Sequence, residues 1–526
     1  MDNRLPPIPF RPTLPELLRQ ACARFADDDF VVMPDRRVSF AEAERASAWI
    51  AKRMLTAGIG KGTRVGIILP TGIDWLLAWL AAGRIGALAM LFPSTYRPAE
   101  LRRALRISDT ALLFAAPTML GKDYEAFLEQ AIPSLREHQH GPLRDPEVPF
   151  LRSIWLMGGS DRAWATTIDP ADTTGDLVTD DLLAAVESEV SPADPLLVIY
   201  TSGSSADPKA VVHTQGATIR KVQAEYGMAL PASVPGRTFC AMPFFWVGGP
   251  QDLLGALHSG AAVVTQERFD LHEALELLER ERCTSVAGWG GLIEQILAHP
   301  AAADRDLSAL VTSTSRLLTY SSKGDPANFG MTETFGPHFN RTWFDYQVVD
   351  PDTGEVLPDG EIGEFCVRGF GLMAGRYKLE REEVFDRDGW YHTGDRGYLE
   401  DGQIWFKGRY SEMVKAGGAN VSPLEVEQVL VSFPDVAQAF VLGIVDPVGG
   451  ETVAAVVVPA PGAVLDPEDL RRRANAELSG YKVPRRWLVM PEDEVPRLGS
   501  GKPDKLTLRE RFDFTASPAA LGSPRR

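Results

Sequence analysis

Short apolar runs alternate with helical stretches along this chain, and this alternation constrains its fold more than any other feature of the sequence. A helical stretch at residues 40–55 precedes apolar runs at 65–69 and 87–92. Similar apolar runs recur at 196–200, 261–265 and 284–287. Buried strands that alternate with helices are typical of a mostly parallel sheet with helices packed on it. The sequence therefore predicts a large α/β body.

The pattern changes toward the C-terminus. Strand-like runs at residues 363–368 and 403–407 are separated by Asp-Gly and Thr-Gly turns, which indicates a β-rich subdomain over about 348–408. Shorter helix-like and strand-like segments fill residues 409–512, and this length is normal for a domain. We predict three parts: an N-terminal domain at 1–408, a small mobile C-terminal α+β domain at 409–512 and a disordered tail at 513–526.

Net charge and cysteine spacing exclude several classes of function. The 526 residues carry a formal net charge of −17, whereas proteins that bind nucleic acid or anionic membranes broadly present basic surfaces. The four cysteines stand far apart and form neither a disulfide framework nor a CxxC metal pattern. The N-terminus lacks an apolar secretory core, and charged or proline residues interrupt the most apolar stretch. We expect a cytoplasmic protein that has no membrane span and binds small molecules, not nucleic acid.

The segment at residues 200–215 carries the clearest chemical signal. After Thr201 it places four consecutive small residues, namely Ser202, Gly203, Ser204 and Ser205. Hydroxyls and backbone N–H groups in such a run can hold phosphate oxygens, and Lys209 adds positive charge. The segment is neither a Walker A motif nor a nucleophile elbow. By itself it predicts a phosphate-binding loop, with an ordinary surface turn as the alternative.

Five further segments follow this loop in a fixed order. They read MPFFWVGG at 242–249, NFGMTET at 328–334, WYHTGD at 390–395, FKGR at 406–409 with KAGGAN at 415–420, and PRLGSGK at 496–502. Together with the 200–215 segment they resemble the motifs of the adenylate-forming superfamily, which includes acyl-CoA synthetases, firefly luciferase and the adenylation domains of peptide synthetases. The resemblance spans residues 12–510 and is greatest to bacterial fatty-acyl-CoA synthetases.

This resemblance implies a two-step reaction that depends on ATP. A carboxylic acid, here a fatty acid, would be converted to its acyl-AMP with release of pyrophosphate. Coenzyme A would then take up the acyl group and release AMP. Attack of a carboxylate on the α-phosphate brings two anions together, so the site must supply cations and aligned donors. The implied cofactors are ATP, Mg²⁺ and coenzyme A.

The resemblance also implies roles for individual residues in the first step. Lys502 would reach the reacting carboxylate as the main catalytic residue, Thr332 would contact the α-phosphate, and Glu333 would bind Mg²⁺. The nucleotide would be held by Thr201, Ser202, Gly203, Ser204, Ser205, Lys209, Asp395 and Arg409. For each residue taken alone, an ordinary place in a turn or on the surface is the alternative.

For the second step the resemblance implies that the C-terminal domain rotates about a hinge at Ser411. Gly417 and Gly418 would then line the tunnel for coenzyme A, because glycines without a Cβ allow close backbone approach, and Lys415 would lie beside them. Further candidates for the nucleotide end of coenzyme A are Lys482, Arg485 and Arg486. A solvated basic face is the alternative for these cations.

The acyl pocket is expected near Phe245, Trp246, Gly248 and Gly330, because aromatic walls and glycine floors suit an uncharged chain or ring. Relatives that activate amino acids usually carry an aspartate in the segment that here reads Phe-Phe-Trp at 244–246. The absence of an acid there disfavours a peptide-synthetase function. Plain core packing of the tryptophan is the alternative.

The chain departs from the family pattern in two shortened intervals, 310–328 and 333–348, and no adenine-binding loop is recognisable in the first of them. Ala206 and Ala210 also replace residues that are usually glycine in the phosphate loop. Two alternatives therefore stay open. One is an acyl-AMP ligase that loads the phosphopantetheine of an acyl carrier protein, and the other is a non-catalytic member of the fold. The sequence does not specify the acid or the oligomeric state.

Overall fold

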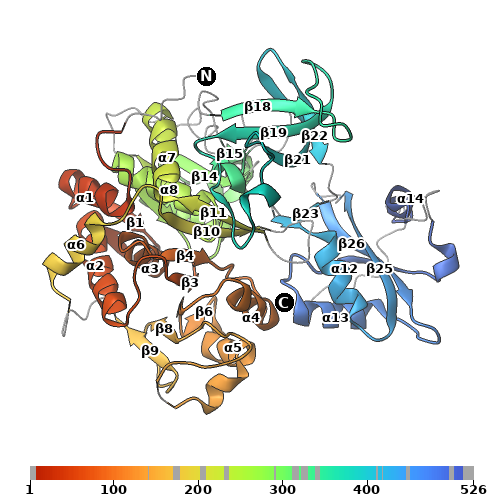
Figure 1. Ribbon diagram of the computed structural model, residues 1–526, viewed down its shortest axis with the longest axis horizontal. Coiled ribbons are helices and arrows are strands. Elements are labelled where there is room, and N and C mark those ends of the chain that lie inside the picture. Colours follow the sequence, from red (N-terminus) through yellow and green to blue (C-terminus); the bar gives the residue numbers. More distant parts are fainter. Residues whose placement is uncertain are drawn as a thin grey trace. The chain divides into compact units, whose positions relative to one another are not determined.

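The computed structural model divides into two compact units and confirms the predicted fold class, a large α/β body with a smaller α+β domain (Figure 1). The first unit comprises residues 1–200 and 210–410, and the second comprises residues 201–209 and 411–526. The predicted N-terminal domain at 1–408 differs from this division because it included residues 201–209. The structure describes residues 8–139, 141–169, 178–201, 209–229, 236–289, 292–310, 319–320, 330–337, 344–409, 413–416, 419–445, 451–496 and 503–512.

An eight-stranded sheet forms one core of the first unit, in the order β20-β11-β10-β4-β3-β5-β8-β9. The pairs from β10 to β9 are parallel, and the edge strand β20 is antiparallel to β11. Ile67 and Leu91 belong to one core cluster, whereas their neighbours Ile68 and Met90 belong to another. Both faces of the sheet are therefore buried, which explains the uninterrupted apolar runs. The strands are β3 (Arg64–Ile68), β4 (Leu88–Leu91), β5 (Leu112–Ala115), β8 (Ser153–Met157), β9 (Ala165–Ile168), β10 (Pro195–Thr201), β11 (Lys209–Thr214) and β20 (Gly375–Arg376).

A six-stranded sheet forms the second core, in the order β15-β14-β12-β13-β1-β2. All its pairs are parallel except the β1–β2 hairpin, which is antiparallel. The strands are β1 (Asp29–Val32), β2 (Arg37–Ser39), β12 (Arg237–Cys240), β13 (Ala262–Thr265), β14 (Ser285–Trp289) and β15 (Thr319–Tyr320). A separate small hairpin pairs β6 (Thr118–Met119) with β7 (Lys122–Asp123).

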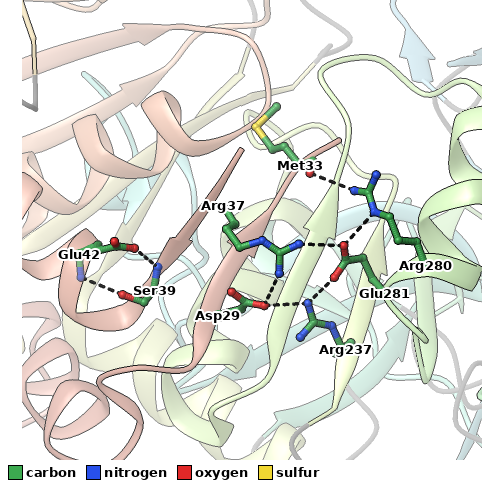
Figure 2. A network of polar contacts seen from close by, with 8 residues as sticks. All are labelled: Asp29, Met33, Arg37, Ser39, Glu42, Arg237, Arg280 and Glu281. Atoms are coloured by element: carbon green, nitrogen blue, oxygen red, sulfur yellow. Dashed lines mark hydrogen bonds and ion pairs between the residues drawn. The ribbon is translucent and has the colours of Figure 1, made fainter. Parts of the chain in front are cut away.

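Helices pack against both sheets (Figure 1). Helix α2 starts at a capping box, in which the Ser39 hydroxyl accepts from the Glu42 N–H and the Glu42 carboxylate accepts from the Ser39 N–H (Figure 2). Helix α3 is apolar on nearly every side because it packs against helices α1 and α2 and against strands β3 and β4. The helices are α1 (Leu14–Phe25), α2 (Phe40–Thr56), α3 (Ile73–Arg84), α4 (Pro98–Ile107), α5 (Tyr124–Ala131), α6 (Asp180–Ser188), α7 (Gln215–Ala229), α8 (Gly248–Ser259), α9 (Leu271–Arg280) and α10 (Leu292–Ala298).

A four-stranded antiparallel sheet completes the first unit, in the order β18-β19-β21-β22. Asp401 and Gly402 join its last two strands and both have positive φ, as an Asp-Gly hairpin turn requires. Just before this sheet in the chain, the two-residue strands β16 (Gly330–Met331) and β17 (Gly336–Pro337) pair with each other. The larger strands are β18 (Phe344–Val349), β19 (Gly363–Gly369), β21 (Tyr391–Glu400) and β22 (Gln403–Arg409).

The second unit folds around the antiparallel pair β25–β26, whose inward residues form an apolar core with helices α12 and α13. Strand β25 pairs with β26 along its whole length, and both β27 and the first strand of the hairpin β23–β24 pair with β26 in parallel. The elements are β23 (Val414–Ala416), β24 (Ala419–Val421), α12 (Pro423–Val431), β25 (Val436–Val445), β26 (Glu451–Pro459), α13 (Pro467–Glu477), β27 (Arg486–Val489) and α14 (Lys505–Glu510).

Several predicted features lie outside the described residues. They are the hinge Ser411, the catalytic Lys502, the tail at 513–526, the tunnel glycines Gly417 and Gly418, and the loop residues Ser202, Gly203, Ser204 and Ser205. Across the described ranges, no helix combines the length and apolar character that crossing a membrane requires.

Candidate active site

A short turn, Thr332–Thr334 (η4), carries two of the predicted ATP-site residues. The Thr334 hydroxyl closes this turn, because it accepts from the Met331 N–H at 3.1 Å and lies 3.0 Å from the carbonyl oxygen of Gly336. Phe335 ends the turn with a φ of 55°, a left-handed conformation that is uncommon outside glycine. Its ring is fully buried. These contacts hold the backbone of the turn in a single conformation.

His213 connects strand β11 to this turn. Its Nε2 lies 2.8 Å from the carbonyl oxygen of Thr332, and because a carbonyl only accepts, Nε2 carries the proton. The imidazole also packs edge-on against Phe335, with ring centroids 5.0 Å apart. Burial lowers the pKa of His213 to about 4, against the opposing effect of the hydrogen bond to Thr332. The ring is therefore neutral at pH 7. On helix α7, buried Lys221 donates to the carbonyl oxygen of Phe335 at 3.2 Å.

Two further segments hold Glu333. The Met373 N–H donates to its backbone carbonyl at 2.7 Å, and the Tyr391 hydroxyl donates to its side-chain Oε1 at 2.8 Å. The Glu333 side chain is 9% exposed and that of Tyr391 is 3% exposed. The backbone and one carboxylate oxygen of Glu333 are thus fixed by segments about 40 and 60 residues away in the chain.

The surroundings of Glu333 fit the predicted metal. Among the described residues, no three His, Cys, Asp or Glu side chains gather in a way that could enclose a metal ion. Mg²⁺ does not need such a cage when it binds with ATP, because the phosphates and water supply most of its ligands and one or two carboxylates complete them. A single oriented carboxylate on a rigid turn is such a ligand. When bound, the ion would neutralise phosphate charge.

Asp395 and Arg409, two predicted ribose contacts, meet across the β21–β22 ladder, where they are direct partners. Asp395 is 3% exposed, and its N–H donates to the Thr393 hydroxyl at 3.0 Å. The preceding N–H, that of Gly394, donates to the Glu364 carboxylate at 2.8 Å. Gly394 has a φ of 73°, which suits glycine. The segment before Asp395 is therefore held from strand β19.

The same carboxylate takes part in a cluster around His392. The His392 Nδ1 lies 3.0 Å from Glu364 Oε2 and 3.4 Å from the Cys366 sulfur, and Nε2 lies 3.7 Å from Asp386. Contacts with Cys366 and Glu364 raise the pKa of His392 to about 10. A protonated His392 at neutral pH therefore bridges acidic groups next to the predicted ribose site.

The ends of the predicted phosphate loop lie on neighbouring strands. Thr201 is the last residue of β10 and Lys209 is the first residue of β11, and these strands are adjacent in the eight-stranded sheet. Loops that follow a strand of such a sheet are common sites for phosphate groups. The roles of both residues in ATP binding stay predictions.

The aromatic segment predicted to line the acyl pocket follows strand β12. Phe244 is fully buried and its ring lies 5.5 Å from that of Trp75, which makes it a core residue. Phe245 is also buried, whereas Trp246 is only partly buried. The Phe245 and Trp246 rings meet nearly at right angles, with centroids 5.8 Å apart. Trp246 is thus the member of the segment with surface left for a ligand.

Glycines that follow this segment are explained in part by packing. A Cβ at Gly249 would lie 2.5 Å from the Cα of Phe244, and a Cβ at Gly248 would lie 3.0 Å from the Met242 side chain. Because neither glycine has a Cβ, the start of helix α8 can pack directly against the residues that precede it, 242–244. Gly330, in β16, is partly buried two residues before Thr332. The pocket role of Gly248 and Gly330 stays a prediction.

The second unit corrects one candidate for coenzyme A binding. Lys482 is 3% exposed and its Nζ donates to Glu425 at 2.8 Å, because the lysine stem packs in the domain interior. It is therefore a buried ion-pair partner and not a surface cation. Lys415, Arg485 and Arg486 are exposed.

Sequence reasoning assigned no role to three residues that shape this site, His213, Lys221 and Tyr391. Two of them stood inside segments that the motifs had already singled out, at 200–215 and 390–395. Alternation along β11 places His213 on the same buried face as Val211, and a polar residue on such a face needs a partner. The sequence therefore indicated that His213 needs a hydrogen-bond partner, but it did not show which residue the partner is.

An ionic network at the opposite ends of the strands serves the fold and not the site (Figure 2). Glu281 accepts from Arg37 at 3.1 Å, from Arg237 at 2.6 Å and from Arg280 at 3.0 Å. Asp29 accepts from Arg37 and Arg237, each at 2.9 Å. Asp29 and Arg237 begin the strands β1 and β12, whereas ligands of parallel sheets bind beyond the carboxyl ends. Although burial opposes it, the arginines lower the pKa of Glu281.

Two family models and several known proteins match the chain along most of its length. The model of the AMP-binding enzyme family covers residues 18–377, and that of the AMP-binding enzyme C-terminal domain covers residues 425–502. A Mycobacterium tuberculosis ligase that joins CoA to a methyl-dioxo-octahydro-indenyl propanoyl group is 30% identical over 95% of this chain and 98% of its own. The sulfoacetate–CoA ligase of Cupriavidus necator is 28% identical over 97% and 99%.

A solved structure agrees with these matches. The amide bond synthetase McbA of Marinactinospora thermotolerans superposes with a TM-score of 0.77 and 26% identity, over 94% of this chain and 99% of its own. The matched ranges include the Thr332–Thr334 turn and most of the second unit. Fold, motif order and family models agree, and the chain therefore belongs to the AMP-binding, adenylate-forming enzymes.

Proposed function

We propose that this protein is an AMP-forming acid–thiol ligase that activates a carboxylic acid with ATP and transfers it to coenzyme A. A carboxylate oxygen attacks the α-phosphorus and pyrophosphate leaves, giving the acyl-AMP. The thiol sulfur then attacks the acyl carbonyl carbon, AMP leaves and the thiol proton is released. Membership of the family and the two CoA ligases among its relatives support this reaction class.

One observation carries the proposal, namely the clamped turn that presents Glu333. Its carbonyls are bound from β11, α7 and the Met373 segment, and its carboxylate is bound by Tyr391. Charge-stabilising groups are effective when they are fixed before the reaction, because no reorganisation is then needed as charge develops. Thr332 and Glu333 are the proposed α-phosphate and Mg²⁺ contacts, and Lys502 is the proposed catalytic cation.

The acid is proposed to be apolar and of fatty type. Trp246 offers partly exposed aromatic surface beside Phe245, and the 244–246 segment carries no acid to pair with a substrate ammonium. The named acids of the two CoA ligases differ widely, one a fused-ring propanoate and the other sulfoacetate, a short carboxylic acid with a sulfonate group. The acids used to test the proposal must therefore include short, medium and long chains as well as aryl acids.

A second candidate is transfer of the acyl group to an amine. The neighbour McbA is named an amide bond synthetase and matches nearly the whole chain. In that reaction the amine nitrogen attacks the same acyl-AMP carbonyl and AMP leaves. A third acceptor, the phosphopantetheine of an acyl carrier protein, would use the same first step.

The test is acid-dependent release of pyrophosphate with ATP and Mg²⁺, measured with coenzyme A, with an amine and with neither. We expect turnover with an apolar acid that rises with coenzyme A. Lys502→Ala should lower the rate about a hundred- to a thousand-fold, whereas Lys122→Ala, at an exposed lysine, should not change it. Turnover that rises with the amine alone would transfer support to amide synthesis. Folded protein that releases no pyrophosphate with any acid would overturn both candidates.

A further inference from the structure

Tyr391, in the 390–395 motif, contacts Glu333 directly, although the family resemblance assigned it no role. It begins strand β21, and its hydroxyl donates to Oε1 of Glu333 at 2.8 Å. Both side chains are at least nine-tenths buried. The bond joins the four-stranded sheet to the turn that carries Glu333.

Arg376 is the second residue that contacts the Tyr391 hydroxyl. It belongs to the edge strand β20, and one of its Nη atoms donates to the Tyr391 hydroxyl oxygen at 2.9 Å. An arginine can only donate, so the tyrosine oxygen accepts this bond and the single phenol proton is left for Glu333. The three side chains form a chain of hydrogen bonds with one direction, from guanidinium to phenol to carboxylate.

This direction has a physical consequence for the carboxylate. A cation that donates to the phenol oxygen polarises the O–H group and strengthens its bond to Glu333, since linked hydrogen bonds reinforce one another in a buried setting. Oε2 of Glu333 makes no hydrogen bond or ion pair within the described part of the chain. One oxygen is fixed, and the other remains for a ligand.

We propose that Tyr391, supported by Arg376, is a positioning residue that orients the Glu333 carboxylate toward the Mg²⁺ that accompanies ATP. The inference rests on the proposed function, because it takes Glu333 as the metal contact. A purely structural hydrogen bond is the competing explanation. The two differ in one measurable respect, namely whether removal of the hydroxyl acts on ATP binding only when Mg²⁺ is present.

The test is ATP binding by Tyr391→Phe, measured by isothermal titration calorimetry in Mg²⁺ and separately in EDTA. A lost hydrogen bond to a buried carboxylate corresponds to about a tenfold change in an equilibrium constant. We expect the dissociation constant in Mg²⁺ to rise about tenfold and that in EDTA to stay within twofold of the parent value. Tyr124→Phe is the matched control, because Tyr124 is also buried but its hydroxyl has no hydrogen-bond partner among the described residues.

A second variant tests the chain of donors. Arg376→Met should weaken Mg²⁺-dependent ATP binding less than Tyr391→Phe does, because it leaves the phenol in place. In the Tyr391→Phe background the same change should have no further effect, since Arg376 acts through the tyrosine. Additive losses in the double variant would overturn the ordered chain.

The outcomes separate this inference from the proposed function. Equal losses of ATP affinity with and without Mg²⁺, or no loss at all, would overturn the positioning role while the parent protein still releases pyrophosphate. A parent protein that binds ATP equally well in Mg²⁺ and in EDTA and releases no pyrophosphate would overturn the proposed function itself. Thermal unfolding of each variant checks the fold, and Arg376→Met provides an independent test if Tyr391→Phe is unstable.

Discussion

Buried His213 should make the stability of the first unit depend on pH. Its pKa is about 4 in the folded protein and about 6.5 in an unfolded chain. The unfolded state therefore binds the proton more readily, and stability is lost as the pH falls through 6.5 toward 4. The complete loss corresponds to about 3 kcal/mol, of which about 1 kcal/mol falls between pH 7 and pH 5.5.

The perturbation that isolates this effect is His213→Gln. The Nε2 amide of glutamine can donate to the Thr332 carbonyl as the imidazole does, but it does not titrate. The variant should therefore lose about 1 kcal/mol less stability than the parent between pH 7 and pH 5.5. Lower pH should be avoided, because the isoelectric point of about 5.1 favours precipitation.

Urea unfolding followed by tryptophan fluorescence measures this difference. Of the eleven tryptophans only Trp487 lies beyond residue 410, so the signal reports the first unit. His258→Gln is a positive control, because burial also lowers the pKa of His258 to about 4 while its Nε2 bonds to the Ile219 carbonyl and not to the turn. If His213→Gln and the parent lose the same amount of stability between pH 7 and pH 5.5, the argument that His213 is buried and neutral is refuted.

Three other changes test the packing and charge described above. Glu281→Gln should destabilise the first unit by about 2 kcal/mol in urea unfolding, since three arginines lose their shared acid, whereas exposed Glu276→Gln should cost under about 0.5 kcal/mol. Gly249→Ala should cost about 2 kcal/mol because the added methyl group meets backbone, whereas Gly159→Ala has open space and should be neutral in the same assay. His392 has a pKa raised to about 10, so its stabilisation is present below pH 6.5 and is lost as the pH rises toward 10. His392→Gln should therefore reduce the alkaline fall in melting temperature, and an unchanged fall would contradict the ion pairs described.

Periodicity predicted the local elements well. The apolar run at 65–69 became β3, that at 196–200 became β10, and the helical stretch at 40–55 became α2 with a capped start. The Asp-Gly pair at 401–402 became the hairpin turn that it indicated. These features depend on residues within about ten positions of one another, so that the sequence alone contains their cause.

Burial of a polar residue was harder to foresee. Lys482 looked like a surface cation in the sequence, but the folded second unit buries it against Glu425. A lysine carries a long apolar stem, and whether its charged end reaches water depends on what packs around it. No local pattern distinguishes the two cases when the partner lies 57 residues away.

The fold class and the family could be predicted from the sequence, because the motifs and apolar runs that indicate them are patterns of residue types within short segments. How the site is held became clear only when distant segments were seen in contact. His213, Glu333 and Tyr391 come from strands and turns separated by dozens to more than a hundred residues. Which of them meet depends on the order of strands in the sheets, and that order is set by the burial of apolar faces over the whole unit rather than by any one segment.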